Sequence, residues 1–356
     1  VILPVGISFY TFHGLSYVID IYYKRIKAET NFIDYSLFVS YFPLLVAGPI
    51  ERATHLLPQV KVKREFNFQK AKEGIHQIIW GLVKKVVIAD SCAMYANEVF
   101  NNHEQMNSLS LVLGAIYFAF QIYGDFSGYS DIALGTSKLF GIDLLKNFNF
   151  PYFSRDIAEF WRRWHISLSS WFRDYLYIPL GGSKGGKWMQ VRNTFIIFLV
   201  SGFWHGANWT FIAWGLINAI YFLPLLLLNR NRSNLEDITF KWNVQGLQTL
   251  LHILLTFSIT TFAWIFFRAK SISDALLYIK KMFTNLNFDI QYLSNERYAP
   301  ELLALIGVFV LFEWFHKYKT EPISGKYENV KLLFCIMAIL ALGVFSDYKE
   351  FIYFQF

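Results

Sequence analysis

Apolar and polar residues follow a pattern along this chain that is typical of a membrane protein. A helix needs about 20 mostly apolar residues to cross a hydrocarbon core about 30 Å thick. Apolar runs of roughly that size lie at 1–23, 108–124, 247–267, 300–318 and 331–346. We therefore predict an all-α, polytopic transmembrane helical protein.

Two further apolar stretches are irregular. Residues 36–50 are short and contain two prolines and a glycine, and residues 74–100 carry Lys84, Lys85 and Asp90 among apolar positions. Interrupted segments are tolerated at membrane depth only where protein or a water-filled cavity surrounds them. We expect both stretches to line an interior instead of facing lipid.

The segment 193–229 runs for 37 residues without one Asp, Glu, Lys or Arg. A single helix of that length would measure about 55 Å, far more than the hydrocarbon core. A break is therefore expected between Ser201 and Asn208, where glycines permit a turn and close helix packing. His205 lies at this predicted break. The intervals 229–246 and 284–299 are predicted to be loops, the second with a short interfacial piece.

The composition agrees with a membrane protein. Of the 356 residues 54% are hydrophobic and 17% are charged, below the roughly 25% charged residues of soluble domains. Aromatic residues make up 19%, and many Trp and Tyr lie near charged clusters, as in interfacial aromatic belts. A soluble fold of this length could not bury so much apolar surface.

The net charge of +7 is unevenly spread along the chain. Basic residues gather in 151–192, where seven Lys or Arg stand against three acids, and in 61–72. Between apolar spans such runs indicate cytoplasmic loops attracted to anionic lipid, and we expect no nucleic-acid partner. Cys92 and Cys335 show neither a disulfide pattern nor a zinc pattern. The chain begins without Met inside an apolar stretch, so we treat it as a fragment lacking N-terminal helices.

Residues 151–182 are predicted to form one interfacial amphipathic helix. Ser154 is the expected N-cap, and Pro179 with the following glycines ends the helix. Trp161, Trp164, His165, Leu168, Trp171 and Tyr175 recur at three- and four-residue spacing and would share one face. One interpretation makes this an anchor helix whose histidine only hydrogen-bonds a neighbour; the other gives that histidine a role in chemistry.

His205 lies among Gly, Trp and apolar residues at the predicted break. Ionisable side chains at membrane depth are costly, face an interior and usually serve function. The structural interpretation pairs a neutral His205 with Asn208 or with a backbone carbonyl. The functional interpretation makes it a general base, because a neutral imidazole can take a proton.

Other chemistries lack their motifs. The eight histidines show no metal-binding spacing, and no Gly-x-Ser-x-Gly elbow is present. GGSKGGK at 181–187 resembles a phosphate loop, but Trp188 replaces the required Ser or Thr, so the segment is either a turn or a loose phosphate contact. Asp125 and Asp131 follow an apolar span and either line a pathway or hold helices together.

Four segments together resemble the membrane-bound O-acyltransferase (MBOAT) family. They are FPLLVAGPIER (42–52), QIYGDFSGYSDIALG (121–135), FWRRWHISLSSWFRDYLYIPLGG (160–182) and SGFWHGANWTFIAWG (201–215), in the family's order and spacing. Residues beyond 270 match only as a hydrophobic tail. The residues of the last two segments are similar to those of the bacterial branch of alginate and peptidoglycan O-acetyltransferases. They are less similar to those of the D-alanyl transfer protein of teichoic acid synthesis.

The resemblance implies a fold of tilted, broken helices around a central tunnel, in a single domain over 1–356. The core would cover 1–270 and further transmembrane helices 271–356. It implies catalytic roles for His205, near the middle of the tunnel, and for His165. Members that acylate lipids commonly have Asn at the second position, which argues against sterol or diacylglycerol acylation here. Tunnel and substrate candidates are Tyr123, Asp125, Ser127, Trp164, Trp204 and Asn208. Candidates for contact with donor phosphates are Arg162, Arg163, Lys184 and Lys187; no metal is expected.

The resemblance further implies transfer of an acyl group, acetyl in the first place, from a cytoplasmic thioester such as acetyl-CoA. The acceptor would be a polysaccharide or a carrier, with an extracytoplasmic acetyltransferase partner and no tightly bound cofactor. The location would be the bacterial plasma (inner) membrane. D-alanyl transfer to teichoic acid remains an alternative, as does a transporter or flippase that uses Asp125, Asp131 and His205 as pathway groups.

Overall fold

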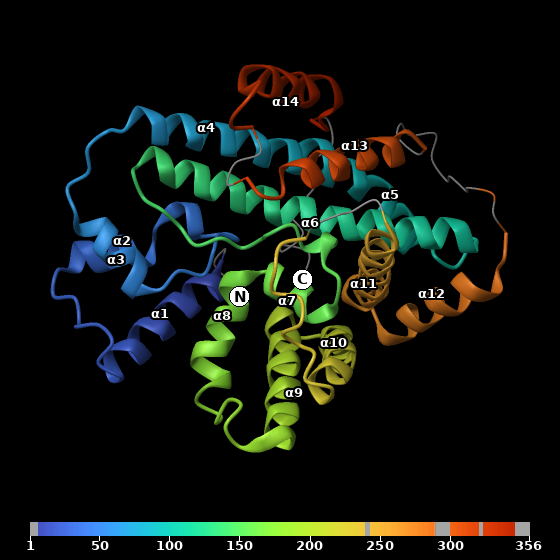
Figure 1. Cartoon of the computed structure of the whole chain (residues 1–356), viewed down its shortest axis with the longest axis horizontal. Coiled ribbons are helices and arrows are strands. Elements are labelled where there is room, and N and C mark those ends of the chain that lie inside the picture. Colours follow the sequence, from blue (N-terminus) through green and yellow to red (C-terminus); the bar gives the residue numbers. More distant parts are fainter. Residues whose placement is uncertain (1–5, 239–242, 288, 290–299, 320–322, 346–356) are drawn as a thin grey trace.

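The computed structural model describes residues 6–238, 243–287, 289, 300–319 and 323–345 (Figure 1). Every regular element in these ranges is a helix, which confirms the all-α prediction. The α-helices are α1 (Ile7–Tyr22), α2 (Phe32–Val39), α3 (Ala53–Lys61), α4 (Phe68–Leu82), α5 (Asp90–Asn101), α6 (Ser108–Leu139), α7 (Ile157–Arg163), α8 (Ile166–Phe172), α9 (Gly186–His205), α10 (Trp209–Leu227), α11 (Val244–Arg268), α12 (Ile272–Thr284), α13 (Pro300–His316) and α14 (Glu328–Leu342). Short 3-10 turns, η1 (Phe42–Leu44) and η3 (Pro151–Phe153), and π-helices, η2 (Val83–Ala89) and η4 (Arg173–Tyr177), connect them.

Helix α6 runs through the centre of the molecule and packs along α4 (Figure 1). Glycines seven residues apart on each helix face one another, so the backbones approach closely. A Cβ on Gly135 would lie 2.4 Å from the Gly74 carbonyl oxygen, and one on Gly81 would lie 2.6 Å from the Gly128 carbonyl oxygen. Small residues at such a crossing are typical of packed membrane helices.

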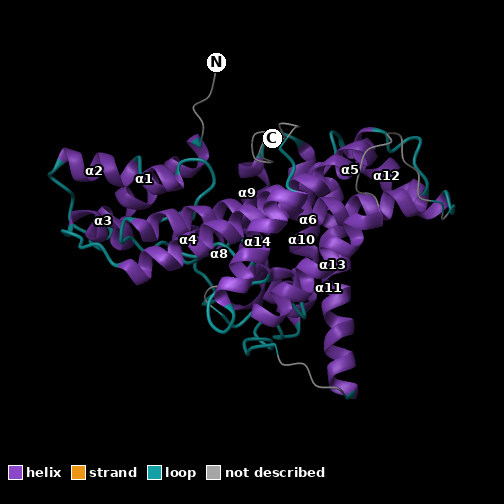
Figure 2. Ribbon diagram, turned by 90° about the horizontal axis from the view of Figure 1, so that it is seen from above, coloured by secondary structure: helices purple, strands orange, loops and turns teal. Residues whose placement is uncertain are grey.

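Three described helices are long and apolar enough to span a membrane, namely α6, α10 and α11. The span predicted at 108–124 is therefore the first part of a 32-residue helix. The span predicted at 247–267 matches α11, and the last two predicted spans correspond to α13 and α14. Figure 2 shows one end of α11 projecting from the body of the molecule. Its Leu247, Leu251 and Leu254 are exposed, as expected of a lipid-facing helix.

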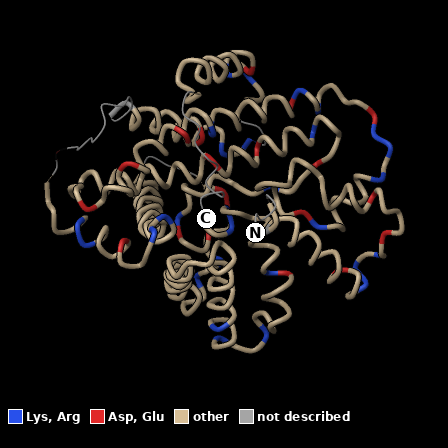
Figure 3. The backbone as a smooth tube through the Cα atoms, turned by 180° about the vertical axis from the view of Figure 1, so that it is seen from behind, with Lys and Arg blue, Asp and Glu red and all other residues tan. Residues whose placement is uncertain are grey.

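The prediction that both irregular stretches line the interior is confirmed for most of 74–100 and for the end of 36–50, whereas Leu37 and Phe42 are exposed. Residues 74–100 form α4, the π-helix η2 and α5, and Lys84 of η2 is only 5% exposed. Residues 36–50 end in η1 and an extended segment whose Ile50 is fully buried. The interval 284–299 falls mostly outside the described residues. The basic run 61–72 covers the end of α3, the loop that follows and the start of α4 (Figure 3).

The prediction of one helix over 151–182 is wrong. The segment is divided into α7, α8 and η4, and the chain turns sharply at Trp164 and His165. The N-cap is Asp156, whose carboxylate accepts from the Glu159 amide, whereas the Ser154 hydroxyl donates to the Pro151 carbonyl. The aromatic residues therefore do not share one helical face.

The break predicted between Ser201 and Asn208 is confirmed. Helix α9 ends at His205, and Asn208 caps α10 by accepting from the Thr210 amide. The two helices form an antiparallel hairpin in close contact, since a Cβ on Gly202 would lie 2.4 Å from the Phe211 carbonyl oxygen.

Candidate active site

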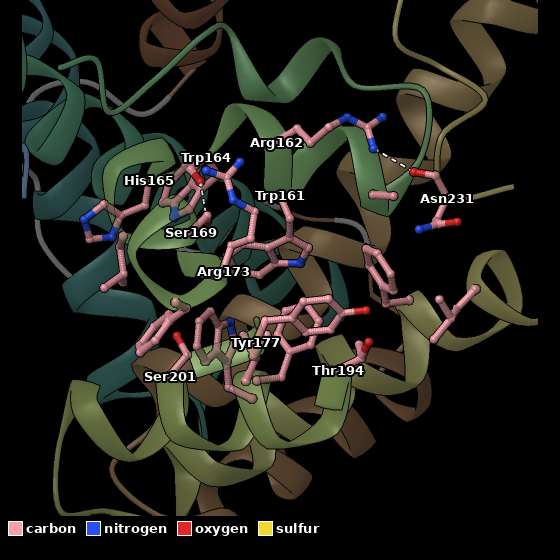
Figure 4. Close-up of a pocket in the computed structure, with 18 of the residues that line it drawn as sticks. Trp161, Arg162, Trp164, His165, Ser169, Arg173, Tyr177, Thr194, Ser201 and Asn231 are labelled. Atoms are coloured by element: carbon pink, nitrogen blue, oxygen red, sulfur yellow. Dashed lines mark hydrogen bonds between the residues drawn. The ribbon is translucent and has the colours of Figure 1, made fainter. Parts of the chain in front are cut away.

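A cavity of about 720 Å³ lies between α7, α8, α9, α10 and α11. Both predicted catalytic residues, His165 and His205, line it. Figure 4 shows side chains of α7 and α8 facing Thr194 and Ser201 of α9 across this space. We call it the main cavity.

The main cavity runs along one face of α9. Gln190, Thr194, Ile197, Ser201 and His205 line it in succession, at the spacing of one helical face. Fifteen residues of helix correspond to about 22 Å. The cavity therefore extends about 22 Å along α9 and holds His205 at one end.

The two ends differ in charge. Arg162, Arg173 and Arg232 line the end opposite His205, which we call the basic end. The Arg162 guanidinium donates to the carbonyl oxygens of Asn231 and Asn234, at 2.7 and 2.9 Å, and so fixes the loop after α10. Arg173 and Arg232 are exposed, and Arg173 Nε also pairs with Asp174 at 2.7 Å.

His165 adopts a left-handed backbone conformation, with φ of 44°. This conformation costs energy for a residue other than glycine and is held by its neighbours. The Ile166 amide donates to the Asn147 carbonyl oxygen at 2.9 Å, and the Ser167 hydroxyl donates to the Asn147 side chain at 2.5 Å. The same hydroxyl accepts from the Ile50 amide. Hydrogen bonds to the segments that contain Asn147 and Ile50 thus hold the geometry of this turn.

The His165 ring is 2% exposed, and its Nε2 is buried without a hydrogen-bond partner in the protein. Its faces contact aromatic rings, with the Phe126 centroid at 4.6 Å. A buried polar atom without a partner is costly unless a ligand or water completes it. Because it lies in a residue that lines the main cavity, this atom is a candidate contact for a ligand or a water molecule.

His205 is enclosed by aromatic rings. The centroids of Trp204, Phe267 and Trp214 lie 4.7, 5.0 and 5.2 Å from its own. Trp204 also contacts the His165 ring at 6.1 Å, so one indole touches both imidazoles. This packing fixes the orientation of both rings.

Comparison with known proteins identifies the family. The model of the membrane-bound O-acyltransferase family matches residues 22–267. The chain belongs to this family.

Three relatives within this family are similar to the chain. "Probable alginate O-acetylase AlgI" of Pseudomonas aeruginosa is 40% identical over 329 residues, which cover 92% of this chain and 61% of the relative. The peptidoglycan O-acetyltransferase of Helicobacter pylori is 38% identical, over 85% of this chain and 60% of the relative. The teichoic acid D-alanyltransferase of Bacillus subtilis is 29% identical, over 75% of this chain and 69% of the relative. The chain thus spans about three fifths of the length of the two O-acetylating relatives.

The motif segments of this MBOAT chain converge on the His165 turn. In the first motif, buried Glu51 accepts from the Leu145 amide and pairs with His55 Nδ1 at 2.7 Å, while its own amide donates to His13 Nε2. This cluster holds the segment that ends in Ile50 against the turn. The hydrogen bond from His55 to Glu51 raises the His55 pKa above its usual value.

A second charge cluster fixes α7. Burial alone would raise the Glu159 pKa, but hydrogen bonds from Arg155 and the charge of Arg163 bring it below its usual value. Both guanidinium groups lie within 3.0 Å of the Glu159 carboxylate. Arg163, expected to meet donor phosphates, is therefore engaged inside the protein.

The remaining predicted tunnel residues divide into two groups. Trp164 lines the main cavity, whereas Trp204 packs outside its lining. Asn208 caps α10 and donates to the Lys270 carbonyl. Tyr123 and Ser127 line a separate pocket of about 70 Å³ between α4, α6 and the loop before η3.

Asp125 lies apart from both pockets and pairs with Lys85 at 2.7 Å. Of the lysines expected to meet phosphate, Lys187 donates to the Leu227 carbonyl, and neither it nor Lys184 lines the main cavity. In the described part of the chain no group of three or more His, Cys, Asp or Glu could hold a metal ion.

Sequence reasoning missed the polar residues that line the main cavity away from the histidines. These include Ser169, Arg173, Tyr177, Ser183, Gln190, Thr194, Ser201, Asn231 and Arg232. The helical spacing of Gln190, Thr194 and Ser201 can be read from the sequence. That this face of α9 lines a cavity cannot, because the other helices form the opposite wall. Asn231 and Arg232 come from a loop, where spacing carries no such signal.

Proposed function

We propose that this protein transfers an acyl group, acetyl in the first place, from a thioester donor to a hydroxyl group. The donor enters the main cavity at the basic end, and the hydroxyl is activated at His205. The observation that carries the proposal is the unpartnered, buried Nε2 of His165 in the wall of the cavity that also holds His205.

The shape of the main cavity supports a long, thin donor. Its anionic part would meet Arg173 and Arg232, which are exposed at the basic end. Acetyl-CoA has this form, with phosphates at one end and a thioester at the other. The roughly 22 Å between Gln190 and His205 leave room for the connecting arm.

The chemistry needs one base and one hydrogen-bond donor. His205 takes the hydroxyl proton as the oxygen attacks the thioester carbonyl and forms the new C–O bond. His165 Nε2, when it carries the ring proton, donates to the oxygen that becomes negative. The C–S bond then breaks, and the proton held by His205 passes to the departing sulfur, so a free thiol and an ester are formed.

The acceptor and the location follow from the relatives by analogy. Since the relatives include alginate and peptidoglycan O-acetylating proteins, we infer a cell-surface polysaccharide, or a carrier that serves it, as acceptor. We place the protein in the bacterial plasma membrane, with an extracytoplasmic acetyltransferase partner that completes transfer. Membership of an acyltransferase family also favours an enzyme over the transporter or flippase.

The experiment uses the full chain in liposomes with acetyl-CoA labelled in the acetyl group. We expect loss of thioester that requires both an acceptor sugar and His205. A D-alanyl thioester offered in parallel separates the aminoacyl alternative. Unchanged thioester with every donor, or equal consumption by His205→Ala, would contradict the proposal.

A further inference from the structure

The turn that carries His165 is an interruption between two short helices. Helix α7 ends at Arg163 and α8 begins at Ile166, and between them Trp164 is extended and His165 is left-handed. If both residues took ordinary helical angles, α7 and α8 would join into one helix, and the His165 side chain would point in another direction. The place of the imidazole in the wall of the main cavity therefore depends on the contacts that keep the two helices apart.

One short segment of the loop after α6 is bonded to the chain on both sides of this interruption. On the α7 side, the Asn149 amide donates to the Arg163 carbonyl oxygen at 3.0 Å, and the Arg163 guanidinium donates to the Asn149 carbonyl oxygen at 3.1 Å. On the α8 side, the Ile166 amide donates to the Asn147 carbonyl oxygen at 2.9 Å. The same segment therefore fixes the residue before the turn and the residue after it.

The Asn147 side chain extends this connection to further segments. Its Oδ1 accepts from the Ser167 hydroxyl at 2.5 Å, and the same hydroxyl accepts from the Ile50 amide at 2.9 Å. Its Nδ2 donates to the Ser130 hydroxyl oxygen of α6 at 2.9 Å. A primary amide suits this place because it offers an acceptor and a donor on one planar group. Asn147 and Ser167 are each 1% exposed and Ser130 is 4% exposed, so water does not readily replace a partner that is lost.

Asn147 and Ser130 lie behind the turn and not in the main cavity. Neither residue lines that cavity, and both line the separate pocket of about 70 Å³. They can therefore act on a reaction in the main cavity only through the turn that they support. Because a shift of about 1 Å at a reacting group can lower a rate by about 10²-fold, this support bears on the hydrogen bond that His165 donates in the proposed reaction.

We propose that Asn147, anchored by Ser130, is a positioning residue for acyl transfer. It holds His165 in the left-handed conformation that keeps the imidazole in the wall of the main cavity. The inference rests on the proposed function, and it adds two residues that touch neither the donor nor the acceptor. It also makes α6, the central helix of the fold, the base on which the turn is fixed.

The first test measures steady-state consumption of acetyl-CoA by the full chain in liposomes, per folded molecule. Asn147→Ala removes both side-chain bonds and should lower kcat by about tenfold to 100-fold. The KM for acetyl-CoA should change by less than about twofold, because the basic end lies about 22 Å along α9 from His205. Ser130→Ala removes only the anchor, should lower kcat about threefold to tenfold, and decides the matter if Asn147→Ala does not fold. A normal kcat in the folded variants, or a rise in KM alone, would overturn the inference.

Ser137→Ala is the matched control. Ser137 lies on α6 seven residues after Ser130, is fully buried, and donates within the helix to the Ala133 carbonyl oxygen at 2.8 Å. Both serine variants lose a buried hydroxyl, so Ser137→Ala should keep its kcat even where its unfolding midpoint falls. A loss of kcat in Ser137→Ala equal to that in Ser130→Ala would identify lost stability as the cause and would contradict the positioning role.

The second test asks whether Asn147 acts through His165. In a His165→Ala protein, the added Asn147→Ala change should cause no further loss of kcat, because the ring that Asn147 positions is gone. A further loss as large as that in the unaltered background would mean a general structural role for Asn147 and would sink the inference.

A cryo-electron microscopy structure of Asn147→Ala separates this inference from the proposed function. We expect residue 165 to leave the left-handed conformation, so that its φ becomes negative. A positive φ with the ring unmoved would overturn the positioning role, whether or not the unaltered protein is active. Absence of acetyl-CoA consumption by the unaltered protein would instead contradict the proposed function.

Discussion

Two regions of this molecule place ionisable side chains deep inside apolar helices, and they treat those groups in opposite ways. Between α4, α6 and α13, Lys84 pairs with Asp131 at 2.9 Å and lies 3.7 Å from Glu313, which accepts from the Tyr123 hydroxyl. In the main cavity, His165 Nε2 has no protein partner. The first region pairs its charges internally, whereas in the second His165 Nε2 is buried without a protein partner.

This difference indicates which buried polar groups stabilise the fold and which serve function. Buried charges that are paired resist change, because removing one partner leaves the other uncompensated. Polar atoms that no side chain completes cost stability and persist where a ligand completes them. We therefore assign the Lys84 cluster to holding α4, α6 and α13 together, and the His165–His205 cavity to chemistry.

The largest expected effect concerns His165. His165→Ala should lower acyl transfer by about 10²- to 10³-fold, since one donor to a developing oxyanion is removed. His165→Asn should retain more activity, because Asn tolerates positive φ and brings an amide donor. Steady-state rates per folded molecule check this, and equal rates for the two variants would argue against the hydrogen-bond role.

Breaking the paired region should instead cost stability. Lys84→Met leaves Asp131 and Glu313 without their cation and should lower the free energy of unfolding by about 3 kcal/mol. Denaturant unfolding in detergent measures it, with the exposed Lys63→Met as control. A Lys84→Met protein of normal stability would show that the Lys84 cluster does not hold these helices together.

A smaller effect is expected where α4 crosses α6. Gly135→Ala places a Cβ 2.4 Å from the Gly74 carbonyl oxygen, and separating the helices should cost about 1–3 kcal/mol. Gly14→Ala meets nothing within 4 Å and should be neutral or slightly stabilising, because alanine is the better helix former. Thermal unfolding measures the midpoint of each variant. A lower midpoint for Gly135→Ala than for Gly14→Ala would show that α4 and α6 pack closely at this glycine.

The smallest effect is expected at the basic end. Arg232→Gln should raise the KM for acetyl-CoA about threefold to fivefold with kcat unchanged, because an exposed ion pair contributes about 1 kcal/mol or less. The increase should shrink at high salt. Arg230→Gln, a neighbouring exposed arginine outside the cavity lining, should leave KM unaltered.

Much of the fold could be predicted from apolar length and from interruptions. The break at His205 followed from the uncharged run 193–229, which is too long for one helix. The turn at His165 could not be found this way, because its helical spacing is regular. Tertiary hydrogen bonds that the Ile166 amide and the Ser167 hydroxyl donate to Asn147 override that local preference.

His205 could be proposed as a site residue because it is ionisable in an apolar setting, and His165 because its segment resembles the family's motif. The partners of Asp125 and Tyr123 could not, since Glu313 lies 190 residues from Tyr123 along the chain. Acids that resembled pathway groups in the sequence therefore prove to be paired with lysines. Pairing is a property of the assembled helices and not of any one segment.

The most direct test compares His205→Ala with Glu313→Gln for acetyl-CoA consumption per folded molecule, with thermal unfolding of each recorded on the same samples. We predict that His205→Ala loses at least about 100-fold in turnover at an unchanged unfolding midpoint, and that Glu313→Gln lowers the midpoint but keeps its turnover. A His205→Ala protein that turns over normally, or one whose lost activity is matched by lost stability, would contradict the account.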